Sequence, residues 1–324
     1  MKWLLKLCYT ILICLQLAAC GDSEKASKTW VHDEKGLFTA SFSSDAKYAL
    51  VAATGGPARL IDVASNKTKQ QWQHTDSNDG IIASALSANN QFALTAERAS
   101  LALWEIDSGK IIGYWDFPRI SDLAISADGS HAIIGMENNQ AYYFDLYYGK
   151  IVHTFEHDGS INSVALSANG QYAMTGGNEH QAKLWDLTSG ELKQQWSHTF
   201  KIYQVALSAN GAYAMSNASL GKSRIWNTKT GKMISQLPMR YMTVSAASFS
   251  PDSKTLLTGR PNQRIDLWSV KTGKLLQTWL PKKRSIWRPD TAAIIALEFA
   301  ADGRSFFSET SGGIAQQWRL STKK

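Results

Sequence analysis

The chain has few cysteines, no long apolar segment and only a mild excess of positive charge. All three cysteines, Cys8, Cys14 and Cys20, lie within the first twenty residues, so the rest of the chain offers no thiol and no cysteine nucleophile. The longest apolar run, from Leu7 to Ala19, is too short for a transmembrane helix, which needs about 20 residues. The formal net charge of +7 does not by itself indicate nucleic-acid binding, and we expect no nucleic-acid partner.

The first twenty residues have the layout of a secretory signal: Lys2 and Lys6, then the apolar run, then small residues before Cys20. The segment "LAAC" that ends at Cys20 resembles the lipobox of bacterial lipoproteins. The resemblance implies a signal peptide at 1–19, lipidation of Cys20 and a polar tether at 20–27, with Gly21 favouring the periplasmic face of the outer membrane. Lipid would then attach the protein to the membrane. An uncleaved membrane anchor is the alternative.

Residues 28–324 contain a repeat of seven units. In each unit an Asp or Asn turn separates two short apolar runs, as in "ALSANGQYAM", which predicts a β-hairpin. Successive turn residues are 44, 39, 41, 41, 42 and 50 residues apart, close to the length of a four-stranded propeller blade; they are Asp45, Asn89, Asp128, Asn169, Asn210, Asp252 and Asp302. We therefore predict an all-β, seven-bladed β-propeller.

The second half of each unit supports this prediction. A third strand ends in a large side chain, and in five units a glycine turn and a fourth strand follow. The fourth unit, with His157 before its first strand and Leu184-Trp185-Asp186 at the end of its third, resembles the WD-repeat family. That resemblance implies the propeller fold and says little about function.

The phrase "KTWVH" at 28–32 matches the fourth strands of other units, such as "QQWQH" and "QQWSH", although no repeat unit precedes it. The seventh unit runs through Trp318 and the sequence then ends without a fourth strand. We predict that 28–32 supplies that strand and closes a monomeric ring, which removes exposed sheet edges.

Four histidines, His32, His74, His157 and His198, occupy one repeated position. We expect them to form hydrogen bonds at strand ends, because equivalent positions on separate blades cannot converge on one metal ion. We predict no metal site and no cofactor. WD repeats usually supply an Asp to a histidine-centred network, but that position holds Glu179 in the fourth unit and Asn262 in the sixth, so we expect the full network not to form.

The innermost strands carry chiefly Ala, Ser and Thr, and Asp122 and Glu298 are the channel carboxylates, on well-separated blades. We expect them to be solvated rather than to act as a general acid and base. The sequence favours a non-catalytic platform that binds a protein, while an enzyme or small-ligand binder that uses the central channel remains the alternative.

One insertion, between Trp279 and "IIALEF", stretches the last spacing to 50. It carries Trp287, which fits no strand position, and we expect it to share a rim with the loop at 259–264. The sector is basic, which favours an acidic envelope protein as the partner; the candidate contacts are Trp287, Lys282, Lys283, Arg284, Arg288, Arg260 and Arg264. A rim covered by Trp287 and a merely solvated charged face are the alternatives.

Overall fold

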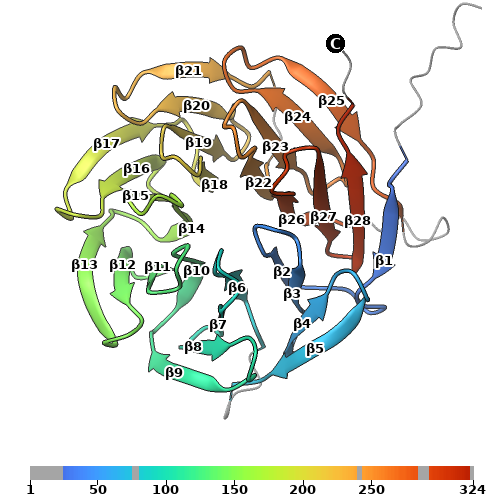
Figure 1. Ribbon diagram of the computed structural model, residues 1–324. Coiled ribbons are helices and arrows are strands. Elements are labelled where there is room, and N and C mark those ends of the chain that lie inside the picture. The colour runs from blue at the N-terminus through green and yellow to red at the C-terminus, as the bar shows by residue number, and fades with distance from the viewer. Residues whose placement is uncertain (1–24, 75–79, 239–242, 284–291, 322–324) are drawn as a thin grey trace, which may run out of the picture.

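The protein is a ring of seven four-stranded antiparallel sheets (Figure 1). The computed structural model describes residues 25–74, 80–238, 243–283 and 292–321. Each sheet is a propeller blade. In six blades the strands run in sequence order from the centre of the ring to its edge, and in the seventh the order is β26, β27, β28 and then β1. The predicted all-β, seven-bladed propeller is confirmed.

The strands fall into four concentric sets. The innermost are β2 (Thr39–Phe42), β6 (Ala83–Leu86), β10 (Ile120–Ile125), β14 (Ile161–Leu166), β18 (Ile202–Leu207), β22 (Ala246–Phe249) and β26 (Ile294–Phe299). The second are β3 (Tyr48–Ala52), β7 (Phe92–Ala96), β11 (His131–Met136), β15 (Tyr172–Gly177), β19 (Tyr213–Ala218), β23 (Thr255–Gly259) and β27 (Ser305–Thr310). The third are β4 (Ala58–Asp62), β8 (Ser100–Glu105), β12 (Gln140–Asp145), β16 (Gln181–Asp186), β20 (Arg224–Asn227), β24 (Ile265–Ser269) and β28 (Ile314–Arg319). The outermost are β5 (Lys67–Trp72), β9 (Ile111–Asp116), β13 (Lys150–Glu156), β17 (Leu192–Ser197), β21 (Met233–Gln236), β25 (Leu275–Trp279) and β1 (Lys28–Val31).

The turn between the first two strands of a blade is built by its Asp or Asn. In blade 1, the Asp45 carboxylate accepts hydrogen bonds from Ser43 Oγ at 2.7 Å and from the Lys47 backbone N–H at 3.0 Å. Ser43 Oγ in turn accepts the Tyr48 N–H at 3.0 Å. These side-chain bonds offer the backbone a turn instead of a continued strand, so the Ser-x-Asp/Asn phrase supports the hairpin in blades 1 to 6, while blade 7 has Ala300 in place of the serine.

Aromatic side chains join neighbouring blades. Trp72 on the outer strand of blade 1 stacks on Trp104 of blade 2 at 5.5 Å, and Trp196 of blade 4 stacks on Trp226 of blade 5 at 5.1 Å. All four rings are buried. Each Trp→Ala change at such a joint would remove about 3 to 5 kcal/mol of packing.

The closing strand is where the sequence predicts it. β1 pairs antiparallel with β28, with Lys28 opposite Gln317 and Val31 opposite Ile314. Figure 1 shows the blue β1 beside the red β28, so segments from the two ends of the described chain complete one blade.

The strand directions define two rims. We call the upper rim the edge that carries the second-to-third turns and the connections between blades, and the lower rim the edge that carries the first-to-second and third-to-fourth turns. β1 is a fourth strand, so it starts at the lower rim with Lys28 and ends at the upper rim with Val31.

Candidate interaction surfaces and the central channel

The repeated histidines lie between blades and are hydrogen-bonded, as predicted. In blade 4, His157 Nε2 lies 2.7 Å from Thr175 Oγ1, which also accepts the Trp185 Nε1–H at 2.8 Å, and His157 Nδ1 contacts the carboxylate of Glu179. The expectation that Glu179 would prevent this network is therefore wrong. The longer Glu side chain reaches the same histidine, and Lys183 Nζ lies 3.2 Å from its carboxylate.

His74 and His198 show the same structural role. His74 Nε2 lies 2.9 Å from Thr95 Oγ1, and His198 Nε2 lies 2.8 Å from Ser216 Oγ. Burial lowers the pKa of each histidine to about 4, so both rings are neutral at pH 7. In the part of the chain that the structure describes, no three His, Cys, Asp or Glu residues are grouped as metal ligands.

The central channel contains a polar cavity of about 340 Å³, lined by inner strands of all seven blades. Asp122 accepts the backbone N–H groups of Leu123 and Val164, each at 2.9 Å, and burial raises its pKa to about 6. Burial also raises the pKa of Glu298 to about 8, against the effect of a hydrogen bond with Ser248. Both side chains line the cavity and are partly exposed to it. Glu298 is therefore mostly protonated at pH 7 and can donate a hydrogen bond.

The predicted basic contacts are only partly in view, because Arg284, Trp287 and Arg288 lie outside the described residues. Lys282 and Lys283 are exposed on the upper rim. The Lys282 backbone N–H donates to Gln316 Oε1 at 2.8 Å, and the Ile294 N–H donates to the Arg260 carbonyl at 3.1 Å. The ends of the insertion thus share a rim with the loop at 259–264, as the repeat predicted.

Arg260 and Arg264 are engaged within their own blade. Arg260 Nη2 lies 2.6 Å from Asp266 Oδ2, and Arg264 Nε donates to Asp266 Oδ1 at 2.8 Å. Arg260 and Asp266 are buried, while Arg264 is partly exposed. Arg260 is therefore held in a buried ion pair, and the binding roles of all seven candidate residues stay predictions.

Blade 5 exposes apolar side chains on the upper rim that the sequence reasoning missed. They are Phe200, Tyr203 and Leu220, which are 39%, 38% and 54% exposed. Leu220 has a φ of 53°, a left-handed conformation that costs a branched or bulky residue about 1 kcal/mol or more. A sequence signal was present, because the left-handed residues of other second-to-third turns are Gly55, Asn139, His180, Gln263 and Gly313, whereas the left-handed residue of this turn is a leucine.

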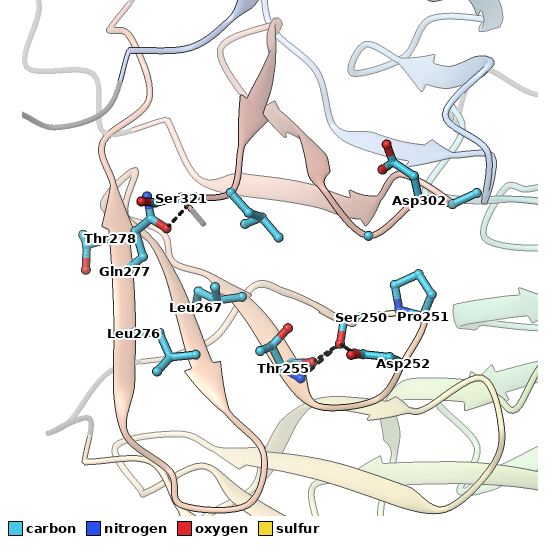
Figure 2. Close-up of a pocket in the computed structure, with 13 residues that line it drawn as sticks. Ser250, Pro251, Asp252, Thr255, Leu267, Leu276, Gln277, Thr278, Asp302 and Ser321 are labelled. Carbon is cyan, nitrogen blue, oxygen red and sulfur yellow. Dashed lines mark hydrogen bonds between the residues drawn. The ribbon is translucent and has the colours of Figure 1, made fainter. Parts of the chain in front are cut away.

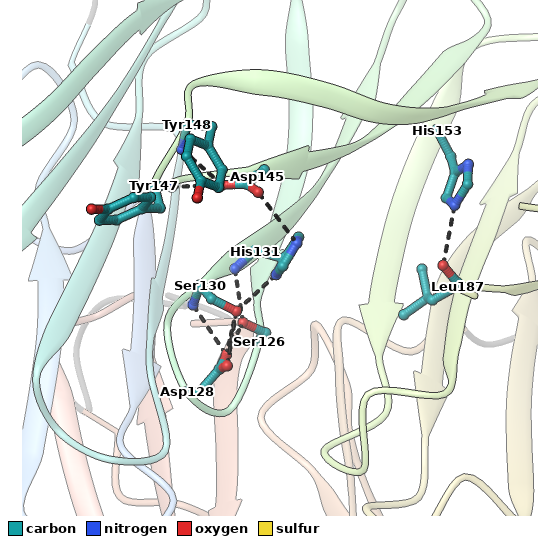
Figure 3. A network of polar contacts seen from close by, with 9 residues as sticks. All are labelled: Ser126, Asp128, Ser130, His131, Asp145, Tyr147, Tyr148, His153 and Leu187. Atoms are coloured by element: carbon teal, nitrogen blue, oxygen red, sulfur yellow. Dashed lines mark hydrogen bonds and ion pairs between the residues drawn. The ribbon is translucent and has the colours of Figure 1, made fainter. Parts of the chain in front are cut away.

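A second missed feature is Tyr147-Tyr148 in the β12–β13 turn of the lower rim (Figure 3). Asp145 Oδ1 accepts both backbone N–H groups, at 2.9 and 2.8 Å, while the two rings are 83% and 70% exposed. Tyr147 also lines a cavity of about 470 Å³ between blades 2 and 3. The sequence could have indicated the tyrosine pair, because corresponding turns carry polar pairs such as Asp107-Ser108 and Thr188-Ser189.

A cavity of about 660 Å³ lies at the corresponding position between blades 6 and 7 (Figure 2). Asp252 and Asp302, from the first-to-second turns of the two blades, lie at one end, and Gln277 and Ser321 lie at the other. In blades 1 and 4 the outer-strand tryptophan donates to a turn glycine of the next blade, Trp72 to Gly109 and Trp196 to Gly231. Among the described residues, the buried Nε1 of Trp279 has no such acceptor.

Comparisons with known proteins agree with this geometry. Residues 149–186, the outer strand of blade 3 and most of blade 4, match the family model "WD domain, G-beta repeat". The chain is also similar to "Periodic tryptophan protein 2" of Arabidopsis thaliana, with 31% identity over 78 residues. That alignment covers 24% of this chain and 8% of the relative's length. None of the described ranges contains a helix long and apolar enough to cross a membrane. The family match and the ring of seven four-stranded blades together support a β-propeller built from WD repeats.

Proposed function

We propose that the protein is a non-catalytic platform for protein binding, anchored by lipid on Cys20 in a bacterial cell envelope, most simply at the periplasmic face of the outer membrane. WD-repeat propellers are commonly interaction scaffolds. The observation that carries the proposal is the direction of β1, because its first residue, Lys28, lies at the lower rim. A tether that ends there holds the lower rim toward the membrane.

The tether also limits the distance. Seven residues, 21–27, span at most about 25 Å even when fully extended. The exposed rings of Tyr147 and Tyr148 belong to the rim that would face the lipid, and tyrosine is favoured at the boundary between water and membrane. The upper rim, with Lys282 and Lys283, would face away and be open to a protein partner.

Two variants test the anchor and the orientation. Replacing Cys20 with Ser should release the protein from membranes in cell fractionation, since lipidation is the attachment proposed. A photo-crosslinking residue placed at Lys282 in whole cells should capture a partner protein, identified by mass spectrometry, and the matched probe at Ser108 on the lower rim should not. Retention of the Cys20→Ser protein on membranes would refute the anchor, and protein capture from Ser108 alone would refute the orientation.

A second candidate function uses the channel, since the polar cavity of about 340 Å³ contains a Glu298 carboxyl that is mostly neutral at pH 7. Cavities of this volume hold small ligands in many proteins. If the channel binds a ligand or carries out a reaction, Glu298→Gln should change that activity while leaving the Lys282 crosslink intact. Loss of the Lys282 crosslink in the Glu298→Gln protein, with no change in a channel activity, would favour the platform function.

A further inference from the structure

The exposed apolar side chains of blade 5 form one patch on the upper rim. The connection from β17 to β18 carries Phe200 and Lys201, β18 itself carries Tyr203 near its start, and the β19–β20 turn carries Leu220 and Lys222. The Ser219 N–H donates to the Lys201 carbonyl at 2.8 Å, which holds these two segments together. Lys201 Nζ lies 4.9 Å from the centre of the Tyr203 ring. We call Phe200, Lys201, Tyr203, Leu220 and Lys222 the blade-5 patch.

Folding gives no reason for Leu220 to be a leucine. Its left-handed backbone suits Gly or Asn better, and its side chain is more exposed than buried. The structure thus keeps a strained residue at a place where its side chain contributes little packing. Strained positions of this kind are concentrated at binding sites, where the gain comes from the partner.

The charge around the patch is positive. The upper-rim loops of blades 5 to 7 expose Lys201, Lys222, Lys282 and Lys283 to solvent. The carboxylates among their described residues are buried, Asp266 beside Arg260 and Glu309 beside His32. The opposite half of the rim, on blades 1 to 4, is less positive, because among its described residues the exposed or partly exposed acidic ones outnumber the basic ones; the acidic residues include Asp33, Glu34, Asp116, Glu137, Glu156 and Asp158, and the basic ones are Lys35, Arg59, Arg98 and Arg119. An acidic partner is therefore directed toward blade 5 and away from blades 1 to 4.

We infer that the blade-5 patch binds an acidic segment of a partner protein and that an aliphatic or aromatic side chain of this segment packs on Leu220, Phe200 and Tyr203. Lys201 and Lys222 attract the carboxylates, and the apolar contact with Leu220 slows dissociation. The inference rests on the proposed function, because it names the surface and the partner class for the upper rim.

A peptide titration with the full chain tests the chemistry. The probe is a fluorescent twelve-residue peptide of Asp, Glu and Leu, compared with one in which Ser replaces Leu and one in which Lys replaces the acids. Anisotropy should show that the acidic peptide with leucine binds at least fivefold more tightly than either control. Leu220→Asn should weaken that binding at least fivefold, while the matched change His180→Asn in blade 4 should leave it within twofold.

Charge-reversal variants distinguish the electrostatic attraction of the acidic peptide from its apolar packing on the patch. Lys201→Glu with Lys222→Glu should weaken binding of the acidic peptide, and by a larger factor at low salt than at high salt. The control Lys110→Glu on the lower rim should have no effect beyond twofold. Leu220→Asn should melt at or above the parent temperature, which excludes unfolding as the cause of lost binding.

Four outcomes would overturn the inference. One is equal affinity for the acidic and basic peptides, and another is unchanged affinity after Leu220→Asn. The third is that anionic phosphatidylglycerol vesicles, rather than the peptide, bind the parent and lose binding in the variants, because the patch would then contact lipid. If the partner crosslink at Lys282 persists in the Leu220→Asn protein, the platform function stands and the assignment to the blade-5 patch fails.

Discussion

Three tryptophans at equivalent positions on outer strands allow the contribution of one indole hydrogen bond to stability to be measured. Trp196 Nε1 donates to the Gly231 carbonyl at 2.9 Å and Trp72 Nε1 to the Gly109 carbonyl at 3.0 Å, whereas Trp279 Nε1 is buried without an acceptor among the described residues. Replacing each tryptophan with phenylalanine keeps an aromatic ring and removes the N–H group. The three variants therefore lose similar packing and differ in hydrogen bonding.

The expected difference follows from these contacts. Trp196→Phe and Trp72→Phe each lose a hydrogen bond with a net value of about 1 kcal/mol. Trp279→Phe instead removes a buried donor that lacks a partner, which relieves a penalty of about 1 to 3 kcal/mol. Trp279→Phe should therefore be more stable than the other two variants by about 2 kcal/mol or more. For a chain of this size, that difference corresponds to several degrees in melting temperature.

Urea unfolding followed by circular dichroism measures the three free energies of unfolding at equal protein concentration. The slope with urea should be the same in all variants, so that midpoint shifts report stability. A Trp279→Phe protein that is no more stable than Trp196→Phe would refute the reasoning. It would mean that an acceptor outside the described residues serves Trp279.

Other predictions concern the histidines, Glu179 and the closing strand. Burial lowers the pKa of His74 and His198 from 6.5 to about 4, so the unfolded state binds more protons than the folded state between these pH values. The free energy of unfolding should therefore fall as the pH drops from about 6.5 to 4, by at most about 3 kcal/mol per histidine. Urea unfolding of His74→Gln should show a weaker decline than the parent, and an equal decline would contradict the assignment. Glu179→Ala leaves His157 and Lys183 without their carboxylate and should lower the free energy of unfolding by about 3 kcal/mol. The exposed control Glu191→Ala should lower it by less than about 0.5 kcal/mol, and equal losses in thermal melts would argue against the network. Deleting residues 28–32 removes β1 and exposes the edge of β28, so the melting temperature should fall and light scattering from aggregates should rise. An added peptide of residues 25–33 should reverse both effects. An unchanged melt would mean that β1 contributes little to closure.

The sequence determined the repeat and most of its local structure. Each Ser-x-Asp/Asn phrase forms its turn through side-chain bonds that need only neighbouring residues, as at Ser43 and Asp45. Gly109 and its equivalents have a positive φ, as the turn chemistry predicted. The closing role of "KTWVH" could also be predicted, because a repeat with one strand missing at one end and one extra at the other has a simple solution.

Other features were decided by contacts between segments far apart in the chain. The sequence cannot show that Arg260 is buried against Asp266 while Lys282 and Lys283 remain exposed, because that depends on how a loop folds over its own blade. It also could not show that Glu179 reaches His157, since a one-methylene difference matters only once the distance between two loops is set. Among the described residues, Trp279 Nε1 lacks an acceptor because blade 7 combines β28 with β1, so no turn joins its third strand to its fourth. Local patterns fix turns and strands through neighbouring residues, whereas burial, charge pairing and the two rims exist only when the ring has closed.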